Sequence, residues 1–290
     1  MSLPTYVLRN GALILPAQAS ISVFTPAIYG AYGVYESMQI VQGVVFAQAP
    51  HLQRLARSAE ILGLRLPGDP AAFDRWIADV LAANMVGDAT LRLFVVGEDE
   101  GGDATAFIWP QPPQIYEQPL YAAGVSVITF TGERYLPQAK SLNSLVTFLA
   151  RRQAQMAGAH EALLHHGGWL TEGSNSNLFA VMDGVVLTPP TVQALAGVTR
   201  DLLISSAGER GLVIRESPLA LADLSRWDEC FITSTSRHVM PVTSVDGRPV
   251  GAGQVGPMTR RLAAIFEEDF QRRIAEGRAG PRRPELIRSR

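Results

Sequence analysis

The chain has 290 residues, of which 47% are hydrophobic and 18% charged, so it holds enough apolar material for one large domain or two smaller ones. A formal net charge of −2 gives no electrostatic basis for binding nucleic acid or an anionic membrane. A single cysteine, Cys230, excludes an intrachain disulfide and suits a small core position. No signal-peptide pattern opens the sequence, and no run reaches the roughly 18 apolar residues of a membrane helix, so we expect a cytoplasmic protein.

Lysine is almost absent from the chain. Of the 25 basic residues, 24 are arginine, and Lys140 is the only lysine. Arginine replaces lysine well at most solvated positions, but only lysine can lose its proton when desolvated and then act as a nucleophile or base. No other charge lies between Leu136 and Ala150. We therefore predict a chemical role for Lys140, the alternative being that an arginine-rich composition left one lysine by chance.

The first 110 residues alternate as a sheet does and contain two helices. The first helix carries its apolar residues on one face and ends at Gly63, and the second begins near Asp69 or Pro70. Gln42 and Gly43 are predicted to form a hairpin turn. In chain order, the predicted elements are strands 5–9, 12–15 and 33–40, helices 49–62 and 71–83, and strands 91–97 and 105–110.

The sequence PQPPQIYEQP, residues 110–119, is the clearest boundary, because its prolines disfavour regular structure. We predict two α+β domains, 1–110 and 122–275, joined by an extended linker at 111–121, and a disordered tail at 276–290. The predicted elements of the second domain are strand 125–130, helix 142–156, strands at 161–166 and within 176–190 with a turn at Asp183-Gly184, helix 199–208, strand 212–217, a helix-like segment 220–227, strand 229–234 and helix 257–274.

Two segments have the chemistry of a phosphate site. Val198 and Thr199 follow Gly197 at a predicted helix start, where free N–H groups and a hydroxyl can hold an anion. Residues 232–238, ITSTSRH, are a hydroxyl-rich turn after an apolar strand. Each segment has a plain alternative, since threonine is an ordinary helix N-cap and such turns are common.

Two charged residues extend this set. Arg54 lies on a predicted helix, where an arginine is usually solvated. Glu172 lies in LTEGSNSN and, taken alone, would be a turn residue. A carboxylate beside a pyridine nitrogen keeps that nitrogen protonated, which makes the ring an electron sink.

Together these segments resemble the class IV (fold type IV) aminotransferases, which use pyridoxal 5′-phosphate and include D-amino-acid transaminases, branched-chain transaminases and aminodeoxychorismate lyase. The resemblance runs from about Ile21 to Phe270 and is most specific in residues 161–190. It implies a two-domain α+β fold with the site in the domain cleft, usually completed across a homodimer interface. The matching segments are residues 33–64, 139–145, 161–190, 195–204 and 229–242.

The resemblance also implies roles for the candidate residues. Lys140 matches the lysine that carries the cofactor as a Schiff base, and Glu172 matches the partner of the pyridine nitrogen. Tyr35 matches an aromatic residue of the substrate pocket, and no metal is expected. We expect ping-pong transamination between an amino acid and a 2-keto acid, with Lys140 moving the α-proton. The residues that match phosphate ligands are Arg54, Val198 through its N–H, Thr199, Ser234 and Thr235.

The subfamily signals conflict. KSLNSL and TEGSNSN are closer to the D-amino-acid and lyase branches than to the branched-chain branch. Branched-chain members typically carry a tyrosine five residues after the lysine and an arginine in the strand after the pocket aromatic, where this chain has Leu145 and Gln39. D-amino-acid enzymes usually bind the substrate carboxylate with an Arg-x-His pair, but the corresponding loop, residues 97–104, holds neither residue type.

The acids of that loop, Glu98, Asp99 and Glu100, would repel a carboxylate if they turned inward, and we expect them to face solvent. We predict that the carboxylate binds instead to N–H groups near Ser236 or to Arg237. A weak carboxylate site would also admit primary amines. Two other functions stay open: a lyase that releases pyruvate from aminodeoxychorismate, and a cofactor-binding relative without activity, which retention of both the lysine and the glutamate disfavours.

Overall fold

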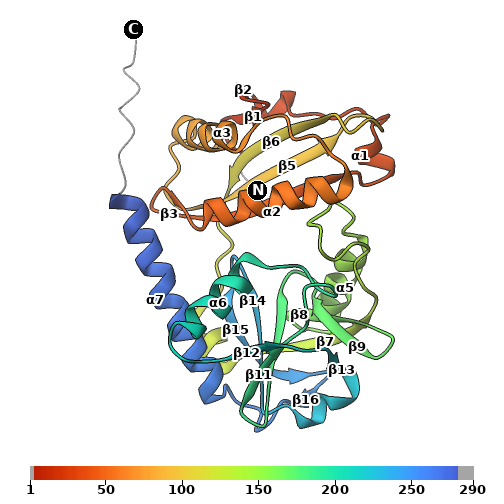
Figure 1. Ribbon diagram of the computed structural model, residues 1–290, viewed down its shortest axis with the longest axis vertical. Helices are drawn as coiled ribbons and strands as arrows, with labels where there is room; N and C mark the ends of the chain where they lie inside the picture. Colours follow the sequence, from red (N-terminus) through yellow and green to blue (C-terminus); the bar gives the residue numbers. More distant parts are fainter. Residues whose placement is uncertain (1–2, 280–290) are drawn as a thin grey trace.

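The computed structural model describes residues 3–279, which form two β-sheets flanked by helices (Figure 1). The elements of the first unit are β1 (Val7–Arg9), β2 (Ala12–Ile14), the 3-10 helix η1 (Pro16–Gln18), α1 (Pro26–Tyr29), β3 (Gly33–Val41), β4 (Val44–Val45), α2 (Gln48–Leu62), α3 (Pro70–Ala83), β5 (Ala89–Gly97) and β6 (Ala104–Gln111). Its six strands pair antiparallel in the order β2-β1-β6-β5-β3-β4, and α2 and α3 pack on them.

The second unit is built on a larger, mixed sheet. Its elements are α4 (Gln118–Ala123), β7 (Val125–Thr131), α5 (Leu145–Met156), β8 (Glu161–His166), β9 (Trp169–Gly173), β10 (Asn177–Met182), β11 (Val185–Thr188), α6 (Val198–Gly208), β12 (Ile214–Glu216), β13 (Leu219–Ala220), η2 (Leu221–Arg226), β14 (Glu229–Ser234), β15 (His238–Val245), β16 (Arg248–Pro249) and α7 (Pro257–Ala279). The strand order is β12-β11-β10-β14-β15-β7-β8-β9-β13, with β16 paired to β15. Two sheets with packed helices confirm the predicted α+β class.

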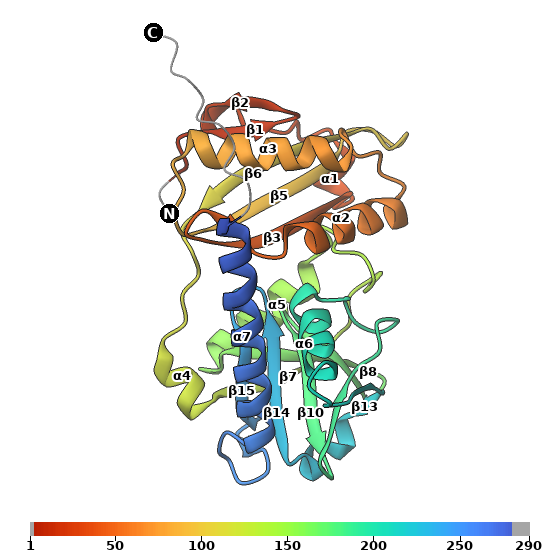
Figure 2. The same cartoon turned by 60° about the vertical axis from the view of Figure 1, so that its left-hand side comes forward.

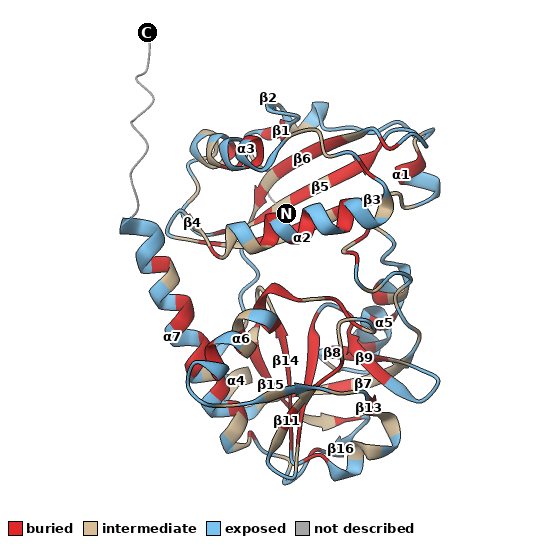
Figure 3. Cartoon of the chain, viewed as in Figure 1, coloured by how far each residue is buried: buried red, intermediate tan, exposed pale blue. Residues whose placement is uncertain are grey.

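The side chains of β3 alternate between a core face and a second, less buried face. Val34, Met38 and Ile40 are buried and belong to the core cluster that includes residues of α2 and α3. Tyr35 and Ser37 point to the opposite face, because successive side chains of a strand alternate. Figure 3 shows the burial concentrated in the strands of both sheets and on the inner face of α2. The local pattern of β3 therefore decides which residues face the site described below.

Both predicted hairpin turns are confirmed. Gln42 and Gly43 have φ values of 51° and 80°, and Asp183 and Gly184 have 50° and 73°. Positive φ at two successive positions is the requirement of a type I′ hairpin turn, and Asp-Gly is among its preferred pairs. These short connections fix the registers of β3 with β4 and of β10 with β11.

The proline-rich boundary is only partly extended. Residues 112–117 have no regular structure, but α4 begins at Gln118, so the last part of the predicted linker 111–121 is helical. Pro119 lies in the first turn of α4, where the missing N–H of proline has no helical partner to lose. The sheets change between β6 and β7, while the division into domains 1–110 and 122–275 stays a prediction.

Several elements differ from the predicted ones. The helix predicted at 142–156 begins at Leu145, and segment 220–227 forms the 3-10 helix η2. Strands β9 and β15 were not predicted. β15 contains Pro241, which argues against a central strand, but pairing with β7 starts only at Val242, so the proline interrupts no hydrogen bond on that side.

Helix α7 connects the two units. It packs on β14 and β15 and then extends to β4 at the edge of the first sheet, as Figure 2 shows. Phe266 and Phe270 of α7 lie in one core cluster with Phe46, next to β4. The helix runs to Ala279, so residues 276–279 are helical and were wrongly assigned to a disordered tail; 280–290 lie outside the described residues. Within residues 3–279, no helix is long and apolar enough to cross a membrane.

Candidate active site

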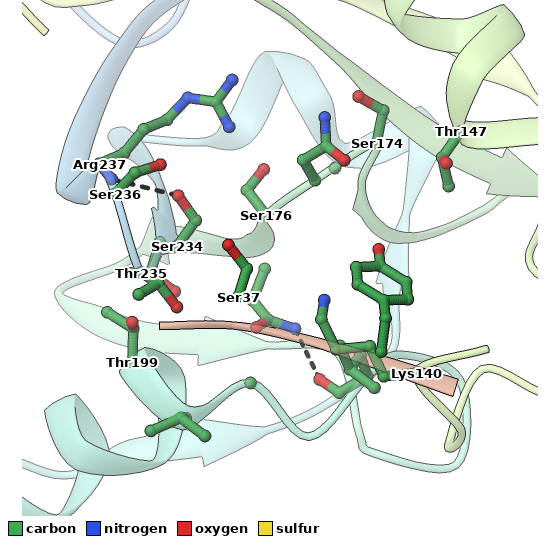
Figure 4. A pocket seen from close by; sticks show the side chains of 18 of the residues that line it. Ser37, Lys140, Thr147, Ser174, Ser176, Thr199, Ser234, Thr235, Ser236 and Arg237 are labelled. Atoms are coloured by element: carbon green, nitrogen blue, oxygen red, sulfur yellow. Dashed lines mark hydrogen bonds between the residues drawn. The ribbon is translucent and has the colours of Figure 1, made fainter. Parts of the chain in front are cut away.

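A pocket of about 260 Å³ lies between the two sheets. It is lined by one face of β3 and β5, by Arg54 of α2, and by loops of the second unit. Figure 4 shows Thr199 and the turn from Ser234 to Arg237 on one side of the pocket and Lys140 on the other. All ten predicted site residues line it: Tyr35, Arg54, Lys140, Glu172, Val198, Thr199, Ser234, Thr235, Ser236 and Arg237.

Lys140 lies in the connection between β7 and α5, and its amine meets an aromatic ring. Lys140 Nζ is 4.5 Å from the ring centroid of Tyr35. Burial lowers the pKa of Lys140, an effect that the Tyr35 hydroxyl opposes and the nearby Arg54 charge reinforces. Conversely, the charge of Lys140 lowers the pKa of Tyr35. These surroundings make it easier for the amine to lose its proton, as the predicted role of Lys140 as a nucleophile would require.

Glu172, at the end of β9, is a buried carboxyl facing the same pocket. Its Oε2 accepts from the Leu195 N–H at 3.2 Å, and its Oε1 lies 3.5 Å from Arg134 Nη1. Burial raises the pKa of Glu172 despite the charge of Arg134. A buried carboxylate is stabilised by a cationic partner, and a protonated pyridine nitrogen would be such a partner.

Arg134 was not predicted as a site residue. Besides contacting Glu172, its guanidinium donates to the carbonyl oxygens of Pro137 and Ala139 and so closes the loop that leads into Lys140. Arg134 therefore links the loop before the lysine to the pocket carboxyl. No local signal in the sequence indicates this contact, because Glu172 is 38 positions further along the chain.

Arg54 is held by a buried ion pair. Its Nε and Nη2 donate to Glu36 at 2.8 and 2.7 Å, and its Nη1 donates to the Ala196 carbonyl at 3.2 Å. His51 Nδ1 also contacts Glu36, at 2.8 Å. Because of the Arg54 and His51 contacts, the pKa of Glu36 falls far below its usual range although the residue is fully buried. This network was not predicted, since an acid in an alternating strand resembles a surface residue.

The start of α6 has the geometry of an anion site. Its N-cap, Gly197, provides no side-chain hydrogen bond, so the first N–H groups of the helix, from Val198 and Thr199, are not capped. A Cβ atom at Gly197 would overlap Asn177 Oδ1, which explains the glycine. Asn177 is itself fixed by donating to the Leu195 carbonyl at 2.7 Å. Val198 and Thr199 are buried and line the pocket, as a phosphate cradle at a helix N-terminus would.

The turn between β14 and β15 adds hydroxyl groups to this side. Thr233 Oγ1 is buried and has no hydrogen-bond partner among the described residues, and Thr233 lines the pocket. Ser234 Oγ accepts from the Arg237 N–H at 3.3 Å, which shapes the turn. The buried Thr233 hydroxyl and the uncapped N–H groups of α6 are therefore hydrogen-bond donors that an anionic ligand could use. The residues present thus fit the phosphate of the cofactor that the sequence resemblance implies.

Arg237 lines the pocket but is already paired. Its Nη1 donates to Glu161 Oε2 at 2.9 Å, and its guanidinium lies 5.1 Å from the ring centroid of Tyr116. Glu161 is fully buried and also accepts hydrogen bonds from the hydroxyls of Ser174 and Ser176. Arg237 is therefore held in a fixed orientation, with Nη1 committed to the protein.

A further pocket cation was not predicted. Arg92 of β5 lies 5.5 Å from the ring centroid of Tyr35 and 5.3 Å from that of Phe94, and burial lowers its pKa. Strand register explains its position: Arg92 pairs with Ser37, so both side chains lie on the pocket face. The acids of loop 97–104 behave as expected, since Glu98, Asp99 and Glu100 are exposed.

Comparisons with known proteins show the family of the chain. The Amino-transferase class IV family model matches residues 33–245, more than half of the chain. A Methanocaldococcus jannaschii protein, named provisionally as a branched-chain-amino-acid aminotransferase, is 37% identical over 271 residues, which cover 89% of this chain and 94% of that protein. The D-alanine aminotransferase of Bacillus licheniformis is 32% identical over 277 residues, covering 91% and 96%.

A solved structure extends the agreement to the fold. The T.th. branched-chain amino acid aminotransferase, determined with pyridoxamine 5′-phosphate, superposes with a TM-score of 0.87 at 27% sequence identity, covering 95% of this chain and 97% of that one. The fold, the pocket with its single lysine and these relatives converge on one conclusion. The chain belongs to the class IV aminotransferase family and is a pyridoxal-phosphate-dependent transaminase.

Proposed function

We propose that the enzyme exchanges an amino group between an amino acid and a 2-keto acid with Lys140 as the residue that moves the proton. When bound, pyridoxal phosphate supplies a conjugated ring that accepts the electrons of the substrate Cα–H bond. Lys140 Nζ, in its neutral form, accepts the proton from the substrate Cα and holds it. The observation that carries this proposal is that the only lysine of the chain lies in the pocket, in surroundings that lower its pKa.

Two groups of residues would hold the cofactor. Glu172 would bind the pyridine nitrogen and keep it protonated, because its carboxylate lines the pocket and would pair with a protonated ring nitrogen. The phosphate would lie between the start of α6 and the β14–β15 turn, where charge and N–H donors converge. The proposed phosphate ligands are Arg54, Val198 and Thr199 together with Ser234 and Thr235.

The substrate would lie between Tyr35 and the β14–β15 turn. We propose that its carboxylate binds the turn at Ser236 and the free edge of Arg237, or Arg92, since all three residues line the pocket. Arg237 has one amino group committed to Glu161, which leaves its remaining donors available for a ligand. The names of the relatives divide between D-alanine and branched-chain substrates, so both donor classes are proposed.

A second copy of the chain would complete the enzyme. Phe148, Leu149 and Met156 on α5 are exposed, as are Phe24 and Tyr29 around α1. Exposed apolar side chains in this number are typical of a surface that another chain covers. We therefore propose a homodimer formed through these helices. The cytoplasmic location stays a prediction, consistent with the single free cysteine.

The test is the visible spectrum of the purified protein with pyridoxal phosphate. We expect a yellow band that Lys140→Ala abolishes, and after borohydride reduction a mass increase on the one peptide that contains the lysine. D-alanine, L-leucine and (R)-1-phenylethylamine are then added separately; loss of the band with one donor, and its return with a keto acid, establishes transamination and identifies the donor. A protein that takes up no cofactor contradicts the proposal. Continued release of pyruvate from aminodeoxychorismate, without a keto acid, would favour the lyase alternative, which the names of the relatives do not support.

A further inference from the structure

The backbone of Lys140 is held by the opposite unit of the protein. Its N–H donates to Ser58 Oγ at 3.0 Å, and its carbonyl accepts from the Tyr35 N–H at 3.0 Å. Ser58 belongs to α2 and Tyr35 to β3, both in the first unit, whereas Lys140 lies between β7 and α5 of the second. The next residues continue this contact, because Leu142 N–H donates to the Gly33 carbonyl at 2.8 Å. The lysine is thus carried by one unit and fixed to the other.

Ser58 and Arg54 lie on the same face of α2. They are four residues apart, the spacing that places side chains next to each other along a helix. Ser58 is fully buried, and Arg54 is nearly so. One rigid element therefore presents both the hydroxyl that holds the Lys140 amide and the guanidinium that faces the phosphate side of the pocket.

We propose that Ser58 is a positioning residue, which sets the distance between Lys140 and the phosphate site through α2. This inference rests on the proposed role of Lys140. A lysine side chain has four rotatable bonds, so the place of its amine is defined only if its backbone is fixed at both ends of the residue. Ser58 fixes the N–H, and Tyr35 fixes the carbonyl while its ring contacts Nζ. A displacement of about 1 Å at a reacting group can cost about 100-fold in rate.

The composition of the chain allows a direct test without cofactor. Because Lys140 is the only lysine, protein labelled with [15N]lysine gives one backbone amide signal, which reports the N–H bonded to Ser58. We expect this amide to exchange slowly with solvent in the wild-type apoprotein and at least about tenfold faster in Ser58→Ala, since a lost hydrogen bond leaves the N–H open to exchange. Unchanged exchange would overturn the proposal.

Activity of the holoenzyme supplies the second readout. We expect Ser58→Ala to lower kcat about 10- to 100-fold while the Kd of pyridoxal phosphate changes much less, because the phosphate ligands remain. The matched control is Ser206→Ala, which removes a buried serine hydroxyl from α6 outside the pocket. Equal kcat values for the two variants would show that Ser58 acts only on stability.

Two further arms keep the test decisive. Ser58→Thr retains the acceptor, so it is expected to restore slow exchange and most of kcat. A folded threonine variant with a protected amide and a low kcat would contradict the proposal. If Ser58→Ala unfolds, the proposal is contradicted when Ser58→Thr restores stability but not kcat. Failure of the wild type to bind pyridoxal phosphate would instead remove the proposed function, and the exchange measurement on the apoprotein would be unaffected.

Discussion

The guanidinium of Arg54 and the carboxylate of Glu36 form a two-point ion pair inside the protein, with Nε and Nη2 bonded at 2.8 and 2.7 Å. Glu36 is fully buried, and Arg54 is 4% exposed. Bidentate pairs of this kind fix the orientation of the arginine as well as its charge. The phosphate side of the pocket therefore receives a guanidinium whose position is set before any ligand arrives.

Glu36→Gln is expected to destabilise the apoprotein by about 3–5 kcal/mol, because it leaves the buried charge of Arg54 uncompensated. The holoenzyme should lose less, since the bound phosphate supplies negative charge near Arg54. Urea unfolding of both forms measures the two differences. Glu60→Gln, an exposed acid on the same helix, should change neither. Equal losses of unfolding free energy in apoprotein and holoenzyme would show that the phosphate does not interact with Arg54.

Glu172→Gln is expected to lower kcat about 100-fold at neutral pH, the scale of losing one well-placed electrostatic partner. The same variant should make the apoprotein more stable at neutral pH. Burial raises the pKa of Glu172, so the native state holds this proton more tightly than the unfolded state does. The contribution of the carboxyl to stability is therefore present below about pH 4.3, the pKa of an unperturbed glutamate, and is lost as pH rises through the raised pKa.

Chemical unfolding of apoprotein between pH 4 and pH 8 tests this sign. With rising pH, the difference in unfolding free energy should shift in favour of Glu172→Gln over the wild type. A shift in favour of the wild type would mean that Arg134 at 3.5 Å outweighs burial and lowers the pKa of Glu172.

Gly197→Ala should weaken cofactor binding, because the added Cβ overlaps Asn177 Oδ1 and must displace either Asn177 or the start of α6. Overpacking of this kind costs about 1–3 kcal/mol. Gly208→Ala, on the same helix with nothing near the added methyl, should leave binding unchanged and stabilise the protein by up to about 1 kcal/mol. Fluorescence titration with pyridoxal phosphate and thermal unfolding distinguish the two variants.

The role of Arg237 is best tested together with its partner. A single Arg237→Met change would leave Glu161 charged and fully buried, so the double variant with Glu161→Gln isolates substrate binding from stability. We expect KM for the preferred amino acid to rise about tenfold or more, the value of one charge-assisted hydrogen bond, and KM for (R)-1-phenylethylamine, which has no carboxylate, to stay constant. If KM for the amino acid is unchanged, Arg92→Met becomes the next variant to measure.

Local sequence signals predicted much of the fold. The two hairpin turns, the glycine that ends α2 and the aspartate that begins α3 all act within a few residues: Gly63 adopts φ 71°, and Asp69 accepts from the Ala72 N–H at 2.7 Å. β15 was missed for a reason that no local pattern contains. Whether Pro241 can lie in a strand depends on where the neighbouring β7 begins, and this is decided by segments more than 100 residues apart.

The site shows the same limit. Lys140 and Glu172 could be named from the sequence because their chemistry is unusual in their surroundings, the one as the only lysine and the other as a carboxylate in a family-like segment. The residues that hold the site in place could not. Ser58, Glu36 and Arg134 are ordinary residue types in ordinary helices, strands and loops, and only long-range packing gives them a partner in the pocket.

The isolation of Lys140 has a practical consequence for handling the protein. Because the sequence contains no other lysine, its one side-chain amine is the one in the pocket. Aldehyde resins, succinimidyl dyes and amine cross-linkers thus have no lysine on the outer surface to attack. Amine reagents applied with the cofactor in place would spare this group, whereas the same reagents applied to the apoprotein would inactivate it through the single lysine that it needs.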